Sequence, residues 1–176
     1  VAGAEYGFDR ALAEEAMRAG FQLAIHAIGD AANRDTLDFY EATCARAPET
    51  CDGRHRIEHA QVLSPADVPR FAELGVIASM EPPHAVEDKG WAEERLGPDR
   101  ILGAYAWRSL RRAGATLTFN ADNPGSDHDI FYGLHAAITR RDREGEPPGG
   151  WYPEQAFTAE EALRAYTSWS AHASFL

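Results

Sequence analysis

Short apolar runs alternate with longer segments of helical periodicity along the chain, as in consecutive β-α units. Helical spacing is clearest after Gly29, where Leu37, Tyr40, Cys44 and Ala47 recur at i, i+3, i+7 and i+10 and form one apolar stripe. The predicted strands are residues 21–26, 54–59, 76–80 and 115–120. The predicted helices are residues 8–19, 30–47, 65–74, 105–113 and 129–141, followed by helices that begin at Thr158.

Glycine, proline and capping residues predict where these elements end. Gly20 ends the first helix, because a left-handed backbone is easiest for glycine. Ser64 is predicted to cap a helix with Pro65 at its first position. Thr158 and Glu161 have the spacing of a capping box, which predicts the start of the last helices.

The segment after the third predicted strand has a different character. Residues 81–84 read Glu-Pro-Pro-His, which predicts an extended turn because proline lacks a donor for a strand ladder. Residues 85–103 then predict a longer excursion with a short helix. Long loops on one face of an α/β fold usually shape a substrate site.

The alternation predicts an α/β fold with a parallel sheet, and no low-complexity linker divides the chain into two domains. The chain has 176 residues, which is short for a complete eight-fold α/β barrel of roughly 250. It also starts at Val1 rather than Met and stops within a predicted helix. We therefore expect residues 1–176 to be one unit, without an internal boundary, of a larger barrel.

Composition argues against two classes of partner. A formal net charge of −11 opposes a phosphate-binding surface, so nucleic acid is not expected to bind. Hydrophobic residues make up 44% and charged residues 26%, which is too polar for a membrane span.

Cys44 and Cys51, with six residues between them, fit neither a redox pair nor a zinc ribbon. We expect reduced thiols in a cytoplasmic protein.

Three side chains that can bind metal, His26, His59 and Asp122, end apolar runs that read as strands. In a barrel of parallel strands the C-terminal ends converge on one face. Imidazole and carboxylate hold Zn²⁺ or a related divalent ion while leaving a position for water. A carboxylate such as Asp122 could take a proton from that water and return it to a leaving amine. Against this stands the ordinary structural role of an isolated strand-end histidine.

Other chemistry-bearing residues have simpler explanations. His55 lies on the same strand face as His59 but deeper, so packing is expected. His135, on a predicted helix, is expected to have a core or surface role. A sugar or cofactor binder that uses the tryptophans is weakly supported, because isolated tryptophans usually pack. These are Trp91, Trp107 and Trp151.

Local motifs around the strand ends add a more specific signal. Four of them are residues 26–30 (HAIGD), 56–61 (RIEHAQ), 79–84 (SMEPPH) and 119–124 (FNADNP). They resemble the metal-dependent amidohydrolase superfamily, and within it the amidohydrolase family 3 branch, which includes N-substituted formamide deformylase-like and exoenzyme-regulator-like proteins. Similar stretches continue at residues 104–109, 134–140, 153–155 and 162–167, so the resemblance spans nearly the whole chain.

The resemblance implies a distorted TIM (β/α)8 barrel beside a small β-sandwich, with this chain supplying strands five to eight and their helices. It implies His26 as the metal ligand from strand five and His59 as the ligand from strand six. Asp122 would be the strand-eight ligand and proton shuttle. His84, after strand seven, would be a substrate-loop residue that polarises the scissile carbonyl. Asp30 would cap the helix that it precedes.

Two departures from the family pattern matter. Strand eight commonly reads Gly-Ser-Asp, whereas this chain reads Asn120-Ala-Asp122. The His-x-His of the first strand and the metal-bridging residue of a middle strand have no counterpart here. The resemblance implies a divalent metal as cofactor, most simply zinc, and the missing residues leave open whether an intact enzyme holds one ion or two. The expected substrate is a small molecule with a non-peptide, amide-type carbon–nitrogen bond.

Half a barrel would leave two open sheet edges and an uncovered inner face. We therefore expect a partner, either the missing N-terminal half of the barrel or a self-associated copy. Alone, the chain should bind metal weakly and show negligible activity, because part of the coordination is missing. The alternative function is a non-catalytic remnant or assembly module that retains the half-barrel fold.

Overall fold

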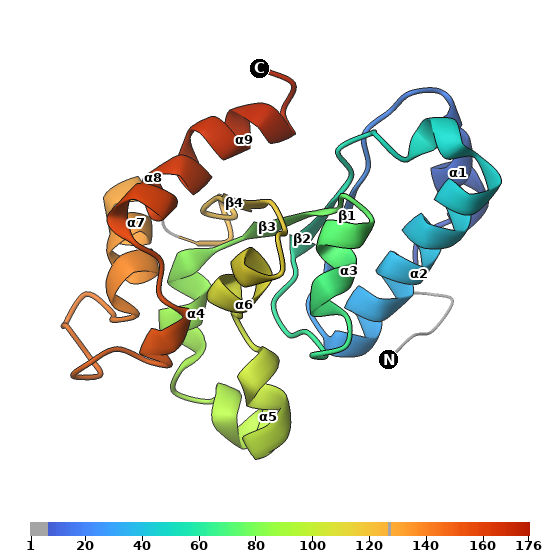
Figure 1. Cartoon of the computed structure of the whole chain (residues 1–176). Coiled ribbons are helices and arrows are strands. Elements are labelled where there is room, and N and C mark those ends of the chain that lie inside the picture. Colours follow the sequence, from blue (N-terminus) through green and yellow to red (C-terminus); the bar gives the residue numbers. More distant parts are fainter. Residues whose placement is uncertain (1–6, 127) are drawn as a thin grey trace.

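The computed structural model describes residues 7–126 and 128–176, so the first six residues of the predicted unit lie outside the described part (Figure 1). Within this part a parallel sheet has its strands in the order β1-β2-β3-β4. The strands are β1 (Ala24–Ala27), β2 (Arg56–His59), β3 (Ile77–Met80) and β4 (Leu117–Phe119). The helices are α1 (Arg10–Arg18), α2 (Asp30–Arg46), α3 (Val68–Glu73), α4 (Pro82–Asp88), α5 (Ala92–Arg100), α6 (Trp107–Arg112), α7 (Ile130–Thr139), α8 (Ala159–Tyr166) and α9 (Ser168–Ala173).

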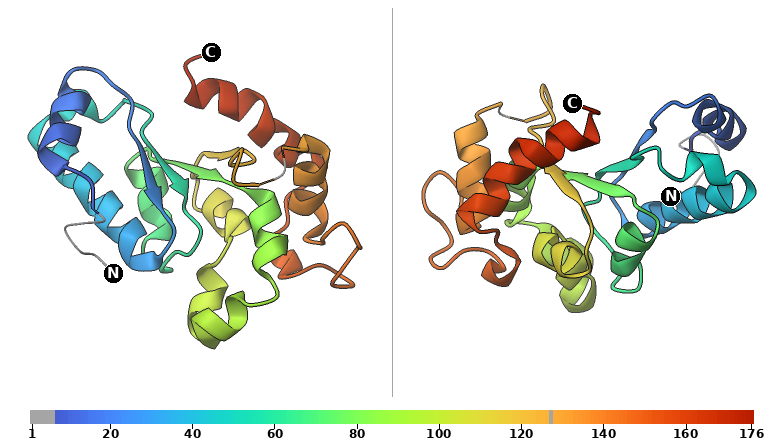
Figure 2. Two further views of the ribbon diagram at one scale, coloured as in Figure 1. Left: turned by 180° about the vertical axis from the view of Figure 1, so that it is seen from behind. Right: turned by 45° about the horizontal axis from the view of Figure 1, so that its top comes forward.

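Parallel pairing brings the C-terminal ends of the strands to one edge of the sheet. Ala27 pairs with His59 across β1 and β2, and Met80 pairs with Phe119 across β3 and β4. Crossover helices α2, α3 and α6 lie along one side of the sheet (Figures 1 and 2). The predicted α/β fold with a parallel sheet is confirmed. Fully buried apolar side chains between these layers include Leu37, Ile57, Phe71, Leu110 and Leu117.

Most predicted helices are found, with small shifts at their ends. The capping box is confirmed, since Thr158 Oγ1 accepts from the Glu161 N–H and the Glu161 carboxylate accepts from the Thr158 N–H. Helix α3 begins later than Ser64 predicted, because the Asp67 N–H donates to the Ser64 carbonyl and closes a turn first. The predicted cap of α8 is therefore confirmed, whereas the predicted start of α3 is several residues too early.

The predicted extended turn at residues 81–84 is wrong, because its two prolines begin helix α4. Pro82 and Pro83 lie in the first turn, where a missing N–H loses no intrahelical hydrogen bond. Glu81 precedes them with extended backbone (φ −117°, ψ 101°), as a residue before proline prefers. His84 therefore leaves the sheet edge from the first turn of a helix instead of from a loop.

The last helix, α9, crosses from β4 toward the N-terminal ends of β1 and β2 (Figures 1 and 2). The Gln22 side chain donates to the Ala173 carbonyl at 2.7 Å, and Arg54 donates to the His172 carbonyl at 2.7 Å. The inner face of the sheet is thus partly covered, not open as expected. A cavity of about 440 Å³ remains there, with a lining that includes Arg56, Glu58, Ser79, Thr118, Ser170 and Ser174.

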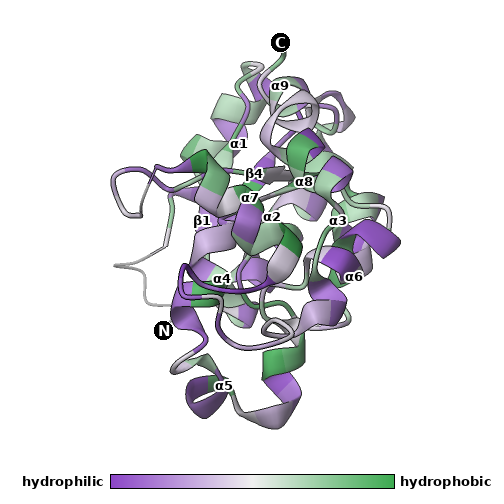
Figure 3. Ribbon diagram, turned by 90° about the vertical axis from the view of Figure 1, so that its left-hand side faces the viewer, coloured by the Kyte–Doolittle hydropathy of each residue, from purple (hydrophilic) through white to green (hydrophobic). Residues whose placement is uncertain are grey.

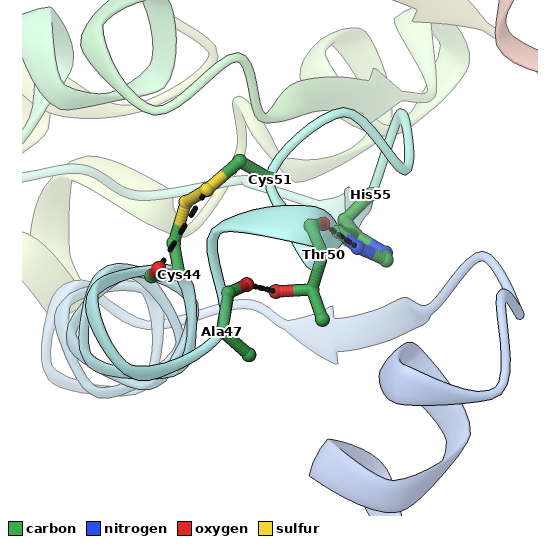
Figure 4. The surroundings of a disulfide bond; sticks show 5 residues. All are labelled: Cys44, Ala47, Thr50, Cys51 and His55. Atoms are coloured by element: carbon green, nitrogen blue, oxygen red, sulfur yellow. Dashed lines mark hydrogen bonds between the residues drawn. A yellow bond between two sulfur atoms is a disulfide. The ribbon is translucent and has the colours of Figure 1, made fainter.

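Cys44 and Cys51 form a disulfide, so the prediction of two reduced thiols is wrong (Figure 4). The bridge joins the end of α2 to the residue after the 3-10 turn Pro48–Thr50. That turn reverses the chain and brings the two Cα atoms to 5.1 Å, which a disulfide requires. The bridge also removes the cysteine argument for a cytoplasmic protein, because disulfides persist mainly in oxidising compartments.

The hydropathy and the length of a helix decide whether it can span a membrane. Hydrophobic and hydrophilic residues are mixed along them (Figure 3). None of the helices in residues 7–126 and 128–176 combines the length and the apolarity that crossing a membrane needs.

Candidate metal centre

Four side chains with metal-binding or proton-transfer chemistry lie around the C-terminal edge of the sheet. His26 belongs to β1, and His59 is the last residue of β2. His84 lies in the first turn of α4, directly after β3, and Asp122 follows β4. Because the strands are parallel, these positions share one edge although they span almost a hundred residues of sequence.

The donor atoms of His59, His84 and Asp122 lie within 4.8 Å of one another. His84 Nε2 is 4.0 Å from Asp122 Oδ2, and the rings of His59 and His84 stack with centroids 5.9 Å apart. The exposed His26 ring packs edge-on against His59 at 4.5 Å, beside this group. Two imidazoles and a carboxylate are a donor set that fits a divalent cation such as zinc.

A buried carboxylate, Glu81, lies on the Nδ1 side of the two stacked histidines. Its side chain is 4% exposed, and Oε2 is 3.0 Å from His59 Nδ1 and 3.7 Å from His84 Nδ1. The hydrogen bond that Glu81 accepts raises the pKa of His59 above its usual range. Sequence reasoning missed Glu81, whose one signal is its place between a buried strand and a proline pair.

The backbone is left-handed at two of the strand ends. His59 and Ala60 have φ of 73° and 44°, and Asp122 has φ of 50°. For residues with a Cβ atom such a conformation costs on the order of 1–3 kcal/mol each, so the surrounding structure must hold it. At Asp122 the Asn120 Oδ1 provides part of this support, because it accepts from the Asp122 N–H at 2.7 Å. Arg54, far from the cluster, has the same conformation, so backbone strain alone does not identify the site.

A smaller cavity of about 130 Å³ is lined by residues that follow the cluster in sequence. Gln61 lies two residues after His59, and Asp88 lies one helical turn after His84 on α4. The Asp88 carboxylate accepts from Gln61 at 2.8 Å and from Tyr105, and burial raises the pKa of Asp88. Apolar walls come from Ile28, Trp91 and Leu96 among others, so part of the 85–103 segment lines this cavity.

Two candidates from the sequence have structural roles. His55 is buried, accepts from the Leu23 N–H at 3.0 Å and donates to the Thr50 carbonyl at 3.0 Å, which confirms packing (Figure 4). Burial also lowers the pKa of His55. Asp30 is the first residue of α2 and pairs with Arg100 at 2.9 Å, a contact that lowers the pKa of Asp30. The cap residue itself is Gly29, one position earlier than predicted.

The remaining candidates do not belong to the group formed by His59, His84 and Asp122. His135, half-buried on α7, hydrogen-bonds to a backbone carbonyl. Trp107 and Trp151 are buried, and the Arg140 guanidinium lies 4.3 Å and 5.3 Å from their ring centroids. Trp91 is half-exposed at the rim of the smaller cavity. The tryptophans therefore do not form a common binding surface.

Fold and site together define a class. Parallel strands with helical crossovers, and an imidazole–carboxylate group at the C-terminal strand edge, are the arrangement of α/β-barrel proteins with their site on that face. The chain represents a four-strand section of such a barrel within its described residues.

The chain belongs to the amidohydrolase family, whose sequence profile matches residues 7–176. It is 36% identical over 160 residues to Protein LONG AFTER FAR-RED 3 of Arabidopsis thaliana, covering 90% of this chain and 27% of that protein. It is 34% identical over 167 residues to N-substituted formamide deformylase of Arthrobacter pascens, covering 93% and 29%. An uncharacterized metal-dependent hydrolase from Pyrococcus furiosus matches with TM-score 0.75 and 31% identity, covering 94% and 32%.

These similarities confirm the resemblance that the motifs indicated and the partial TIM-barrel fold. They also set a boundary. The chain spans less than a third of the length of each of these relatives.

Proposed function

We propose that this chain supplies one section of the catalytic barrel of a metal-dependent hydrolase that cleaves a non-peptide carbon–nitrogen bond of the amide type. The observation that carries the proposal is the convergence of His59, His84 and Asp122 at the C-terminal strand edge. Family membership supports it, as does the name of the Arthrobacter relative, an N-substituted formamide deformylase.

In this proposal His26, His59 and Asp122 hold the cation, with zinc preferred because imidazole and carboxylate are its common ligands. A bound divalent cation would ionise a water near neutral pH and polarise a carbonyl. Asp122, which is 45% exposed, takes a proton at its carboxylate and returns it to the leaving amine. His84 donates a hydrogen bond from Nε2 to the oxygen of the scissile carbonyl, and its position 4.0 Å from Asp122 supports that role.

Activity is proposed for the assembled barrel and not for this chain alone. Three ligands without the others forfeit much of the coordination energy, so metal binding by residues 1–176 should be weak and hydrolysis negligible. The missing N-terminal half of the barrel, or a second copy, would complete the inner face. A non-catalytic remnant or assembly module is the competing proposal, and it predicts a full-length protein without turnover.

The test combines metal analysis with activity. Zinc content and hydrolysis of N-substituted formamides and acetamides would be measured for the isolated chain and for the full-length gene product. We expect Asp122→Asn to lower turnover of the full-length protein by about 10²–10⁴-fold, and the control His135→Ala to leave it near wild type. A metal-replete full-length protein that turns over none of these amides would support the remnant instead.

The ligand set has its own test. His26→Ala and His59→Ala should each remove bound zinc, whereas His84→Ala should lower turnover with zinc retained. Loss of zinc from His84→Ala equal to that from His59→Ala would make His84 a ligand.

A further inference from the structure

Two carboxylates flank the stacked rings of His59 and His84 from opposite sides, and they differ in exposure. Asp122 is 45% exposed and lies 4.0 Å from His84 Nε2. Glu81 is 4% exposed and lies on the Nδ1 side of both rings, at 3.0 Å from His59 and 3.7 Å from His84. A histidine ring offers its two nitrogens in opposite directions, so a partner at Nδ1 decides which nitrogen is left free.

Glu81 is itself held in place by an amide from the neighbouring strand. Asn120 Nδ2 donates to Glu81 Oε1 at 2.9 Å and is 3.0 Å from Ser79 Oγ. The Oδ1 atom of the same amide accepts from the Asp122 N–H at 2.7 Å. One continuous chain of hydrogen bonds therefore runs from the His59 ring through Glu81 and Asn120 to the backbone of Asp122.

An ionised carboxylate only accepts, so with Glu81 ionised the donor in this hydrogen bond is the Nδ1–H of His59. The neutral ring then carries its lone pair on Nε2, the nitrogen that a cation would need. A glycine at position 120 could not make this chain, because the link depends on the Asn120 amide. Asn120, one of the two residues by which this chain departs from the usual strand-eight motif, therefore connects the two sides of the site.

We infer that Glu81, anchored by Asn120, is a positioning residue that fixes His59 in the Nδ1–H tautomer with Nε2 directed into the strand-end cluster. Glu81 acts through His59 and contacts neither substrate nor cation. The inference rests on the proposed function only for the purpose of the free Nε2, since the tautomer exists without metal. Outer carboxylates of this kind typically contribute 10–100-fold to metal affinity.

The tautomer is measured directly by long-range ¹H–¹⁵N correlation spectra of ¹⁵N-histidine-labelled, metal-free chain at pH above the His59 titration. We expect wild type to show His59 as Nδ1–H, Glu81→Ala to move it toward Nε2–H, and Glu81→Gln to restore Nδ1–H, because an amide oxygen also accepts. Glu87→Ala removes an exposed carboxylate on α4, the helix that Glu81 precedes; it is the matched control and should change nothing.

His55 provides an internal reference in the same spectra. It donates through Nε2 to the Thr50 carbonyl and accepts at Nδ1 from the Leu23 N–H, so it should show the opposite tautomer in every variant. A His55 signal that changes in Glu81→Ala would reveal a folding defect, and Glu81→Gln then decides the question alone. An Nε2–H signal for His59 in wild type, or no change in Glu81→Ala with His55 intact, would overturn the inference.

Zinc affinity, measured by competition with a chelator, separates this inference from the proposed function. We expect Glu81→Ala to weaken zinc binding by about 10–100-fold and Glu81→Gln to recover part of the loss. Suppose that the variants show the expected tautomer shifts but that neither the chain nor the full-length protein binds zinc. That result would contradict the proposed function and would still support the positioning role of Glu81. Unchanged zinc affinity in Glu81→Ala, with wild type binding zinc, would contradict the positioning role.

Discussion

Removal of one charge at the start of helix α8 should destabilise the protein in a pH-dependent way. The Glu161 carboxylate accepts two hydrogen bonds from the Arg108 guanidinium, at 2.7 Å and 2.8 Å, and closes the capping box with Thr158. Glu161→Gln keeps an acceptor for the capping box but removes the negative charge. The substitution therefore isolates the contribution of the ion pair that joins α6 to α8.

The magnitude follows from the pKa of Glu161, which the Arg108 hydrogen bonds lower from 4.5 to about 2. That difference corresponds to at most about 3 kcal/mol of stability at neutral pH. The two side chains are 24% and 20% exposed, so solvent screening reduces the expected value to about 1–2 kcal/mol. Because the folded-state pKa is depressed, this contribution is present above pH 4.5 and is lost as the pH falls toward 2.

Urea unfolding at pH 7 and pH 3 would measure this contribution. Glu161→Gln should lower the free energy of unfolding by about 1–2 kcal/mol at pH 7 and by roughly half as much or less at pH 3. Glu160→Gln is the matched control, because Glu160 pairs with Arg164 in the adjacent position but both are exposed, and its effect should stay below about 0.5 kcal/mol.

Equal effects of the two substitutions at pH 7, or a Glu161→Gln effect that is the same at both pH values, would refute the reasoning. If the protein is unfolded at pH 3, a double-mutant cycle of Glu161→Gln with Arg108→Met at pH 7 measures the coupling instead.

Two further substitutions test the core and the disulfide. Arg140→Ala should cost about 2–5 kcal/mol in urea unfolding, because it leaves a cavity beside the rings of Trp107 and Trp151 and removes the donor to the Trp151 carbonyl. Arg112→Ala, exposed on α6, is its control, and a similar small effect of both would contradict the role of Arg140. Replacement of Cys44 and Cys51 by serine should cost about 2 kcal/mol through loop entropy, and reactive thiols in the unreduced wild type would disprove the bridge.

The hydrophobic pattern was sufficient to predict the four strands and a parallel sheet but not the first residue of each strand. Strand β1 begins at Ala24 instead of residue 21. The Phe21 N–H donates to the Ala16 carbonyl at the end of α1, and the Leu23 N–H donates to the His55 ring. These two backbone N–H groups therefore donate to a helix end and to a side chain instead of to a neighbouring strand. The sequence pattern does not show which acceptor an N–H group will find in the folded protein.

Proline at residues 82–83 illustrates a different limit. The missing N–H excludes a strand ladder and equally suits the first turn of a helix. Sequence reasoning chose the loop, and the structure has helix α4. The disulfide between Cys44 and Cys51 was also not predicted, because the distance between the two cysteines depends on how the chain turns after α2.

The candidate site could be predicted in part from the sequence. The hydrophobic pattern placed His26, His59 and Asp122 at strand ends. Their location at one edge of the sheet then follows from the parallel direction of the strands alone. Which donor atoms converge depends on side-chain direction, and there His84 joins His59 and Asp122 while the His26 ring lies beside them. The metal ligands and the role of His84 stay predictions until the variants are measured.

The two carboxylates of the site show why position outweighs residue type. Asp122 and Glu81 carry the same functional group and flank the same pair of imidazoles, yet one is 45% and the other 4% exposed. A carboxylate open to solvent can exchange protons with water and product, as a shuttle must. A buried carboxylate that accepts a hydrogen bond from Asn120 keeps a fixed position, which a residue that orients a metal-binding histidine needs. Burial therefore predicts opposite consequences for their isosteric amides: Asp122→Asn should abolish proton transfer, whereas Glu81→Gln should preserve the orientation of His59.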